Sequence, residues 1–263
     1  MKKIRSIFAK VRTQGFLRTL EVQFNRFVPP WVFRYSKGDI YDLSIEKLKS
    51  LGTTSTSDDR LIAKCLGNDA DESLRLQLRE FTWNSVPIET THDDIGYAIY
   101  DADEPGKLLA GLWAAPNSFL EDSLGVKFEF STEQAWLYCA FVHADARGRG
   151  VYKKLISFAA GDLEERGFSQ LLGIVQPWNR ISRLMHERQS RGIIGRMSAI
   201  RAGSLVLISH AGNLSVSDRV VTNPGSKPTI VLIAKDCWKQ VERSAKQPVR
   251  LGGYGKAGVA KPL

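Results

Sequence analysis

The sequence is poor in the residues that bind metals and form disulfides. It has three cysteines and four histidines in 263 residues, and Cys65, Cys139 and Cys237 are scattered with no C-x-x-C pair. An odd, dispersed set of thiols argues against a disulfide framework and indicates a reducing compartment. The histidines are isolated and show no metal-ligand spacing, so no metal site is expected.

Long apolar runs and common phosphate motifs are also missing. No apolar run reaches membrane-spanning length, and no signal-peptide core follows Met1-Lys2-Lys3, so we expect a protein made and kept in the cytoplasm. The sequence has no G-x-x-x-x-G-K-[ST]. The dinucleotide pattern G-x-G-x-x-G also fails after Gly148, because Lys153 stands where its last glycine belongs.

Positive charge is abundant, but it lies at the two ends. The net charge is +9, of which residues 1–37 carry +8 and residues 235–263 carry +5, so residues 38–234 carry −4. Attraction to polyanions should therefore be a property of the ends. We divide the chain into a basic amphipathic arm (1–37), a linker (38–59), a compact domain (60–234) and a basic, glycine-rich tail (235–263). Within the linker, residues 39–43 are interpreted as a short strand or as part of the linker.

The arm is predicted to form two short amphipathic helices that break near Gly15 and stop at Pro29-Pro30. Its basic residues beside aliphatic and aromatic ones suit the surface of an anionic membrane. The same apolar stripes would also suit packing onto the core or onto a partner subunit, for example in a homodimer. Binding of a nucleic acid fits less well, since no nucleic-acid-binding module surrounds the arm.

The order of elements in the body predicts an α+β fold with a mixed, mostly antiparallel sheet flanked by helices. Strands are expected at 60–66, 95–100, 108–114, 135–142 and 171–175, followed by terminal antiparallel strands at 192–200, 204–209 and 229–234. Helices are expected at 69–81, at 150–165 and after Asn179, and residues 116–132 are expected to form a loop. Strands 135–142 and 171–175 should run parallel and splay apart.

The most informative stretch is Arg147-Gly148-Arg149-Gly150-Val151-Tyr152, which joins a buried strand to an amphipathic helix. The first N–H groups of a helix lack intrahelical partners and carry partial positive charge. Glycines let the backbone approach a bound group, and the arginines add full charges. The expected product is a cradle for a phosphate or a diphosphate.

The stretch resembles the acyl-CoA loop of the GNAT acetyltransferase superfamily, whose pattern is [Q/R]-x-x-G-x-[G/A]. Arg147 and Gly150 match it, whereas Tyr152 stands where a glycine or alanine is usual. The resemblance implies a GNAT-like fold over about residues 60–210 and acetyl-CoA, or another acyl-CoA, as cofactor. Backbone groups of Phe141 and Val142 would hold the pantetheine arm, and the amides from Arg147 to Tyr152 would hold the diphosphate.

A second match begins at Asn179, a good helix N-cap. Asn179-Arg-Ile-Ser182 resembles the Asn-x-x-[Ser/Ala] that opens the helix beside pantetheine in GNAT enzymes, so Asn179 and Ser182 would line the thioester side. By register, His186 replaces the tyrosine that often protonates the leaving thiolate in this family. An imidazole can donate a proton near neutral pH, although a surface histidine on a helix is an equal interpretation.

The resemblance implies direct transfer of an acetyl group to a primary amine. Glu129 and Glu133, just before the central strand, are the candidate bases, although carboxylates at a strand's start are usually solvated. The acceptor would be a small-molecule or glycan amine, such as an amino sugar of a membrane-associated polysaccharide precursor, with the protein peripheral on the inner face of the membrane. The alternative functions are a non-catalytic CoA-binding or regulatory module and a membrane-surface adaptor that works through the arm.

Overall fold

The structure is a computed structural model, and it describes residues 28–29, 32–53, 60–67, 69–82, 93–104, 106–121, 125–222 and 228–232. The two helices predicted for the arm lie outside the described residues, and so does the tail from residue 235. The membrane, partner and core-packing interpretations of the arm therefore stay predictions.

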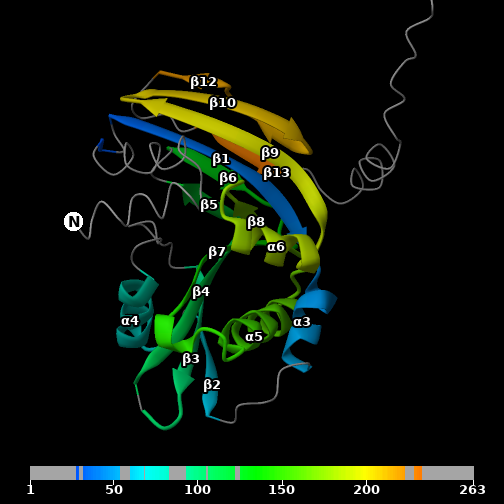
Figure 1. Cartoon of the computed structure of the whole chain (residues 1–263). Coiled ribbons are helices and arrows are strands. Elements are labelled where there is room, and N and C mark those ends of the chain that lie inside the picture. Colours follow the sequence, from blue (N-terminus) through cyan, green and yellow to red (C-terminus); the bar gives the residue numbers. More distant parts are fainter. Residues whose placement is uncertain are drawn as a thin grey trace, which may run out of the picture.

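Nine described strands form one curved sheet in the order β12-β10-β9-β1-β8-β7-β4-β3-β2 (Figure 1). Neighbouring strands run antiparallel except β7 and β8, which are parallel, so the predicted mixed and mostly antiparallel sheet is confirmed. The bounds are β1 Phe33–Leu43, β2 Leu61–Leu66, β3 Ile95–Asp101, β4 Leu108–Pro116, β7 Gln134–Val142, β8 Gln170–Val175, β9 Ser190–Ala202, β10 Leu205–Gly212 and β12 Val220–Val221.

Four described helices flank this sheet: α3 (Ile45–Thr53), α4 (Glu72–Thr82), α5 (Val151–Glu165) and α6 (Arg180–Gln189). Helices α3 and α5 cover one face, and α4 covers the opposite face (Figure 1). Helix α5 ends as its sequence predicts: Gly167 has a φ of 93°, and the Phe168 N–H donates to the Leu163 carbonyl. None of the described helices has both the length and the apolar character that a bilayer crossing requires.

Strand β1 corrects the predicted start of the folded domain. Residues 33–37 were assigned to the arm and residues 38–59 to a linker, yet Phe33–Leu43 pairs with β9 along its whole length and with β8 from Asp39 onward. Residues 45–53 of the expected linker form α3, which packs beside α5. The folded unit therefore begins near residue 33. The error arose because the aromatic and basic residues at the start of β1 resemble an extension of the arm.

A second sheet was not predicted. Residues 116–132 were expected to be a loop, but they contain β5 (Ser118–Glu121) and β6 (Val126–Glu129). These strands join β11 (Leu214–Val216) and β13 (Thr229–Leu232) in the order β11-β13-β6-β5. The expected terminal strand at 229–234 is therefore not part of the large sheet, and it runs parallel to β6.

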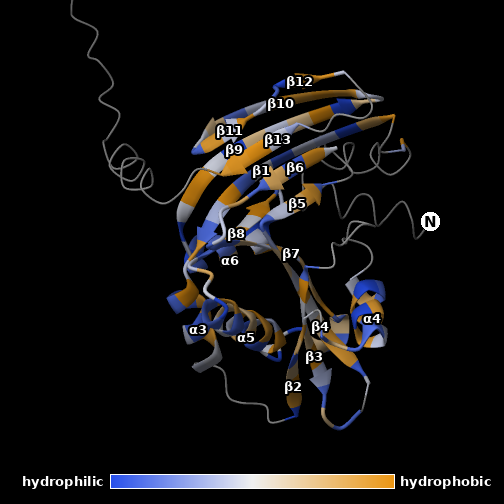
Figure 2. Cartoon of the chain, turned by 180° about the vertical axis from the view of Figure 1, so that it is seen from behind, coloured by the Kyte–Doolittle hydropathy of each residue, from blue (hydrophilic) through white to orange (hydrophobic). Residues whose placement is uncertain are grey.

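The second sheet packs against the large one through aromatic rings. Figure 2 shows the apolar residues of both sheets along facing strands. The fully buried Trp136 of β7 lies 4.8 Å from the Phe128 ring and 5.9 Å from the Phe119 ring, with stacked geometry in both pairs. Such rings contribute both apolar burial and ring–ring attraction. This contact fixes β5 and β6 over the middle of β7.

Candidate functional site

The parallel strands β7 and β8 separate halfway along. They pair at Gln134 with Gln170, at Ala135 with Leu171 and at Trp136 with Leu172, and no β7–β8 pair is described beyond Trp136. The edge of β7 from Leu137 to Val142 therefore faces the gap between the strands, as the sequence predicted. Because this edge carries backbone donors and acceptors, an extended amide-bearing chain can bind there like an added strand.

A β-bulge distorts β7 beside this gap. Gly111 of β4 pairs with Phe141, and Trp113 pairs with Tyr138, so Cys139 and Ala140 together oppose one residue of β4. Cys139 has a φ of 55°, a left-handed conformation that is costly for a residue with a side chain. Bulges take a residue out of the ladder and often lie next to active sites. The bulge at Cys139 and Ala140 changes the direction of the β7 backbone at the point where β7 and β8 have separated.

After β7 the chain makes a short 3₁₀ turn, η1 (Ala144–Ala146), and then the glycine-rich turn. Gly148 has a φ of 79° and Gly150 a φ of 77°, so both adopt the left-handed conformation that glycine tolerates best. Gly150 is the N-cap of α5 and provides no side chain to cap the helix. No other group lies within 4 Å of the position that a Cβ on Gly148 would take. The turn is thus open at the positive end of α5.

The side chains around this turn leave its backbone accessible. Arg147 and Arg149 are exposed, and the Arg147 Nε donates to the carbonyl oxygen of Val142 at 3.4 Å. Tyr152, the departure from the family pattern, packs against the core that α3 and α5 share with the large sheet. Burial raises the pKa of the Tyr152 phenol. The phenol is therefore turned toward the core. The segment from Phe141 to Tyr152 borders one side of the gap between β7 and β8.

Helix α6 opens beside the gap as predicted. The Asn179 side chain is its N-cap and accepts from the Ser182 N–H at 3.2 Å. This bond satisfies one of the donors that the start of a helix leaves unpaired. Asn179 and Ser182 thus lie just after β8, and their role on the thioester side of the cleft stays a prediction.

His186 projects from α6 to the place where β7 and β8 part. A methyl carbon added to Gly173, the first β8 residue beyond the last β7–β8 pair, would lie 3.5 Å from His186 Nε2 and 3.6 Å from the Leu137 carbonyl oxygen. Nδ1 lies 2.8 Å from the carbonyl oxygen of Ser182, and a carbonyl only accepts, so Nδ1 carries the hydrogen. Burial lowers the pKa of the imidazole. The neutral ring then presents the Nε2 lone pair to the gap.

The two predicted bases lie away from the gap. Glu129 alternates with Phe128 on β6 and so projects from the outer face of the second sheet, where it forms an ion pair with Lys127 at 2.8 Å. Glu133 lies in the exposed turn at the closed end of the β7–β8 pair. There its carboxylate accepts from the Ser169 hydroxyl at 3.0 Å. The structure therefore brings neither carboxylate to the splayed ends of the strands.

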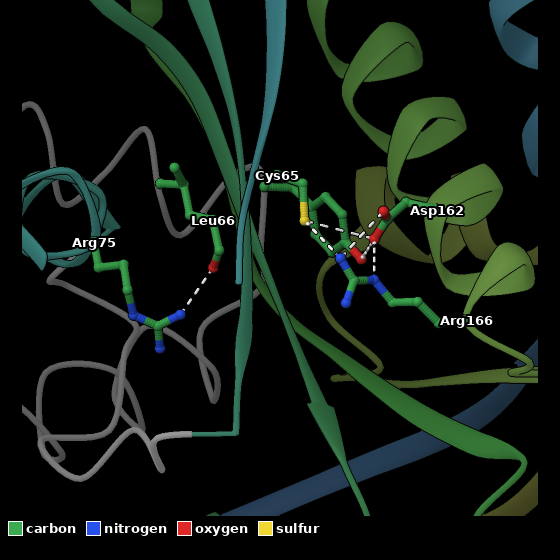
Figure 3. A network of polar contacts seen from close by, with 6 residues as sticks. Cys65, Leu66, Arg75, Asp162 and Arg166 are labelled. Carbon is green, nitrogen blue, oxygen red and sulfur yellow. Dashed lines mark hydrogen bonds and ion pairs between the residues drawn. The ribbon is translucent and has the colours of Figure 1, made fainter. Parts of the chain in front are cut away.

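A polar cluster on α5 ties the helix to the sheet (Figure 3). The Asp162 carboxylate accepts from the Tyr97 hydroxyl and from Arg166 Nε, both at 2.7 Å, and lies 3.6 Å from the Cys65 sulfur. Burial, together with the charge of Asp162, raises the pKa of Cys65 to about 11. A thiol with that pKa is protonated at neutral pH and is a poor nucleophile. We assign a structural role to this cluster.

Comparison with known proteins relates part of the chain to a protein family. The model of the acetyltransferase (GNAT) family matches residues 61–190, which span β2 to the end of α6 and include the glycine-rich turn. No curated protein matches the chain. With the observed strand order, the match gives a mixed α+β fold of the GNAT type.

Solved structures resemble the chain at low identity. A conserved protein of unknown function from Staphylococcus epidermidis shares 8% identity over 70% of this chain and 66% of its own, with a TM-score of 0.40. An aminoglycoside acetyltransferase from an uncultured soil sample shares 16% over 50% of this chain and 88% of its own, with a TM-score of 0.36. A protein from Novosphingobium aromaticivorans described as a GNAT-family acetyltransferase shares 16% over 66% and 68%, with a TM-score of 0.40.

Proposed function

This chain has a GNAT-type acetyltransferase fold, matched by the family model over residues 61–190, and from that premise we propose that it is an acyl-CoA-dependent N-acyltransferase. One observation carries the proposal. Two parallel strands part beside a bulge, and the open edge of β7 leads through the short turn η1 into a left-handed glycine turn at the start of a helix. Together these features suit an extended amide chain that ends in a diphosphate.

The residues present fit acetyl-CoA. The open side of Gly148 and the bare N-cap at Gly150 leave room for phosphate oxygens against backbone N–H groups, and Arg147 and Arg149 add charge. The edge of β7 near Phe141 and Val142 would hold pantetheine. When bound, acetyl-CoA supplies the acetyl group as a thioester with a thiol leaving group.

The chain's own groups would supply the proton handling at the thioester. The Ser182 carbonyl holds Nδ1–H of His186 and fixes Nε2 toward the gap. A neutral imidazole in this position can accept a proton at Nε2 and pass it to the leaving sulfur. An amide of the Cys139–Ala140 bulge would polarise the carbonyl that is attacked.

Calorimetry with CoA and acetyl-CoA tests the cofactor site. The wild type is expected to bind both, whereas Arg147→Ala combined with Gly150→Ala should weaken binding at least tenfold, because it removes a charge and strains the cap. Absence of binding by the folded wild type would refute the function. Normal binding with no acetyl transfer to any amine of a panel of amino sugars, amino acids and peptides would favour a non-catalytic CoA-binding module.

We also propose a glycan amine as the acceptor, specifically an amino sugar on a membrane-associated polysaccharide precursor. The support is the basic, apolar sequence of residues 1–37, which suits anionic lipid, and the mildly acidic composition of residues 38–234. Flotation with vesicles that contain anionic lipid tests the membrane part. The full chain should float and a chain beginning at residue 28 should not, and equal flotation of the two would rule out membrane binding by the arm.

A further inference from the structure

A carboxylate that no sequence motif marks lies on the inward face of the second sheet. Strand β5 pairs with β6 so that Phe119 opposes Phe128 and Glu121 opposes Val126. Residues that oppose each other directly project to the same side of a sheet. Phe119, Phe128 and Val126 are all buried in the core that the second sheet shares with β7. Glu121 therefore projects from this same face, at the half-buried end of β5.

This face lies over β7 next to the bulge. The Phe119 ring lies 4.8 Å from the ring of Tyr138, the residue immediately before Cys139. Glu121 is two residues beyond Phe119, about 7 Å along the same face of the strand. A second observation agrees with this placement: after burial, the charge of Glu121 is what raises the pKa of the Cys139 thiol. The register thus puts the carboxylate on the face that lies over β7, and its effect on Cys139 agrees with a place beside the bulge.

We propose that Glu121 is the general base for the acceptor amine and that the acceptor enters between the second sheet and the bulge of β7. The inference rests on the function proposed above. Helix α5 packs on the other face of the large sheet, so the acceptor would approach from the side opposite that helix. An acceptor ammonium gives one proton to the Glu121 carboxylate. Its nitrogen then forms the amide bond to the acetyl carbon while the carbon–sulfur bond breaks, and a second nitrogen proton ends on the sulfur.

The charges near the bulge favour a cationic acceptor. The buried Asp94 accepts from the Tyr138 hydroxyl at 2.9 Å, which places a second carboxyl group on this side of β7. Arg75 is the cation that acts on Tyr138. Its guanidinium donates to the main-chain carbonyl of Leu66 (Figure 3) and to those of Gly67 and Asp94. An acceptor with an ammonium group is attracted here, and one with a carboxylate near the reacting atom is repelled.

The test compares Glu121→Gln with Glu129→Gln, the same exchange on the outward face of the same sheet. Each protein is first titrated with CoA by calorimetry, which reports the fold and the cofactor site. Acetyl transfer is then measured from pH 6 to pH 10 with the primary amine that the wild type uses best. Glu121→Gln should bind CoA normally and lose about 10²–10⁴-fold in kcat/KM at pH 7.

The pH dependence separates a base from a structural residue. The deficit of Glu121→Gln should shrink as the pH approaches the pKa of the amine, because the free amine then forms without help from the protein. The other ionisable groups that face Glu121 from β7 are Tyr138 and Cys139. Burial raises the pKa of both, and the charge of Asp94 raises that of Tyr138 further, as the charge of Glu121 does that of Cys139. Both groups therefore stay protonated over most of this pH range. A deficit that is constant with pH, or equal losses in the two variants, would overturn the proposal.

A readout without acceptor or acetyl-CoA tests the placement of Glu121. Removing its charge should lower the pKa of Cys139, so alkylation of that thiol by iodoacetamide, mapped by mass spectrometry, should speed up in Glu121→Gln and not in Glu129→Gln. An unchanged rate would refute the position beside the bulge, whatever the assays show. Absence of transfer by the wild type would instead refute the proposed function, and this inference with it.

Discussion

His186 is subject to two opposing effects on its proton affinity. Burial lowers the pKa of the imidazole, whereas the hydrogen bond from Nδ1 to the Ser182 carbonyl raises it, and burial is the larger effect. The folded protein therefore holds the ring neutral at pH values where an unfolded chain would already protonate it. Burial keeps Nε2 unprotonated and able to accept a proton. The same burial should make the fold less stable in acid.

We predict that His186→Gln makes stability less dependent on pH. Because the folded pKa lies below the unfolded value of about 6.5, the unfolded state binds more protons, and wild-type stability should fall as the pH drops through 6.5 toward the folded pKa. Above pH 7 the imidazole is neutral in both the folded and the unfolded state, so its contribution to the free energy of unfolding no longer changes with pH. Urea unfolding of both proteins at pH 5, 6, 7 and 8 checks this. Parallel pH curves for wild type and variant would contradict it.

The residues that carry the candidate site differ in how visible they are in the sequence. The glycine turn and the Asn179 cap are local patterns, so their role followed from a few neighbouring positions. Glu121 gave no such signal, because its face depends on the pairing of Phe119 with Phe128, and β5 has four residues. Val126 and Phe128 alternate with Lys127 and Glu129, a strand pattern within the expected loop that would have turned Glu129 outward.

At the scale of elements, α5 determines how the glycine-rich turn is presented. Its buried face is made of Val151, Leu155, Ile156, Ala159 and Leu163, which fall at helical spacing and pack on the sheet. Gly161 lies within the same helix, and no group lies within 4 Å of the position its Cβ would take. Gly161 therefore lowers the stability of α5, and no close neighbour requires a glycine at this position.

Gly161→Ala is expected to stabilise the protein by about 0.5–1 kcal/mol, because alanine has the higher helix propensity and a less flexible unfolded chain. Thermal unfolding of the variant should show a higher Tm with unchanged CoA binding. Gly150→Ala is the contrasting exchange, since φ is positive there and the same methyl group should destabilise. A Tm below that of the wild type for Gly161→Ala would refute the prediction.

Trp136 connects the two sheets, and its removal should cost more than any surface change. The ring is fully buried and stacks with Phe128, Phe119 and Phe130. Trp136→Ala should therefore lower the free energy of unfolding by about 3–5 kcal/mol through lost burial and a cavity. Denaturant titration measures the loss, and Ile62→Ala on the exposed side of β2 is the matched control, with an expected change below about 1 kcal/mol. A loss of less than about 1 kcal/mol for Trp136→Ala would mean that the sheets do not depend on this contact.

At the scale of the whole molecule, the early part of the chain completes the middle of the large sheet. Strand β1 lies between β8 and β9, and the glycine turn and bulge lie one strand further along. The sequence predicted most strands of the large sheet and the helices α4, α5 and α6, because each of them follows the residue spacing of its own secondary structure. Of β1 it indicated only residues 39–43, as a short strand or linker, because the full strand depends on partners more than a hundred residues away.

A chain that begins at residue 60 is predicted not to fold, because it lacks β1 and α3 and leaves the paired edges of β8 and β9 open. A chain that begins at residue 28 keeps every described strand and helix and should fold and bind CoA as the full chain does. Circular dichroism and calorimetry with CoA compare the two. A soluble, CoA-binding protein that starts at residue 60 would disprove the essential role of β1.

The place of β1 also governs how the protein is assembled during translation. This strand leaves the ribosome early, but Phe33 pairs with Ala202, and Asp39 pairs with Val175 and Arg196. Until those partners have been synthesised, both hydrogen-bonding edges of β1 stay open to other strands, including those of neighbouring nascent chains. High contact order of this kind slows folding, so a newly made chain should depend on chaperones far more than the fully assembled protein does.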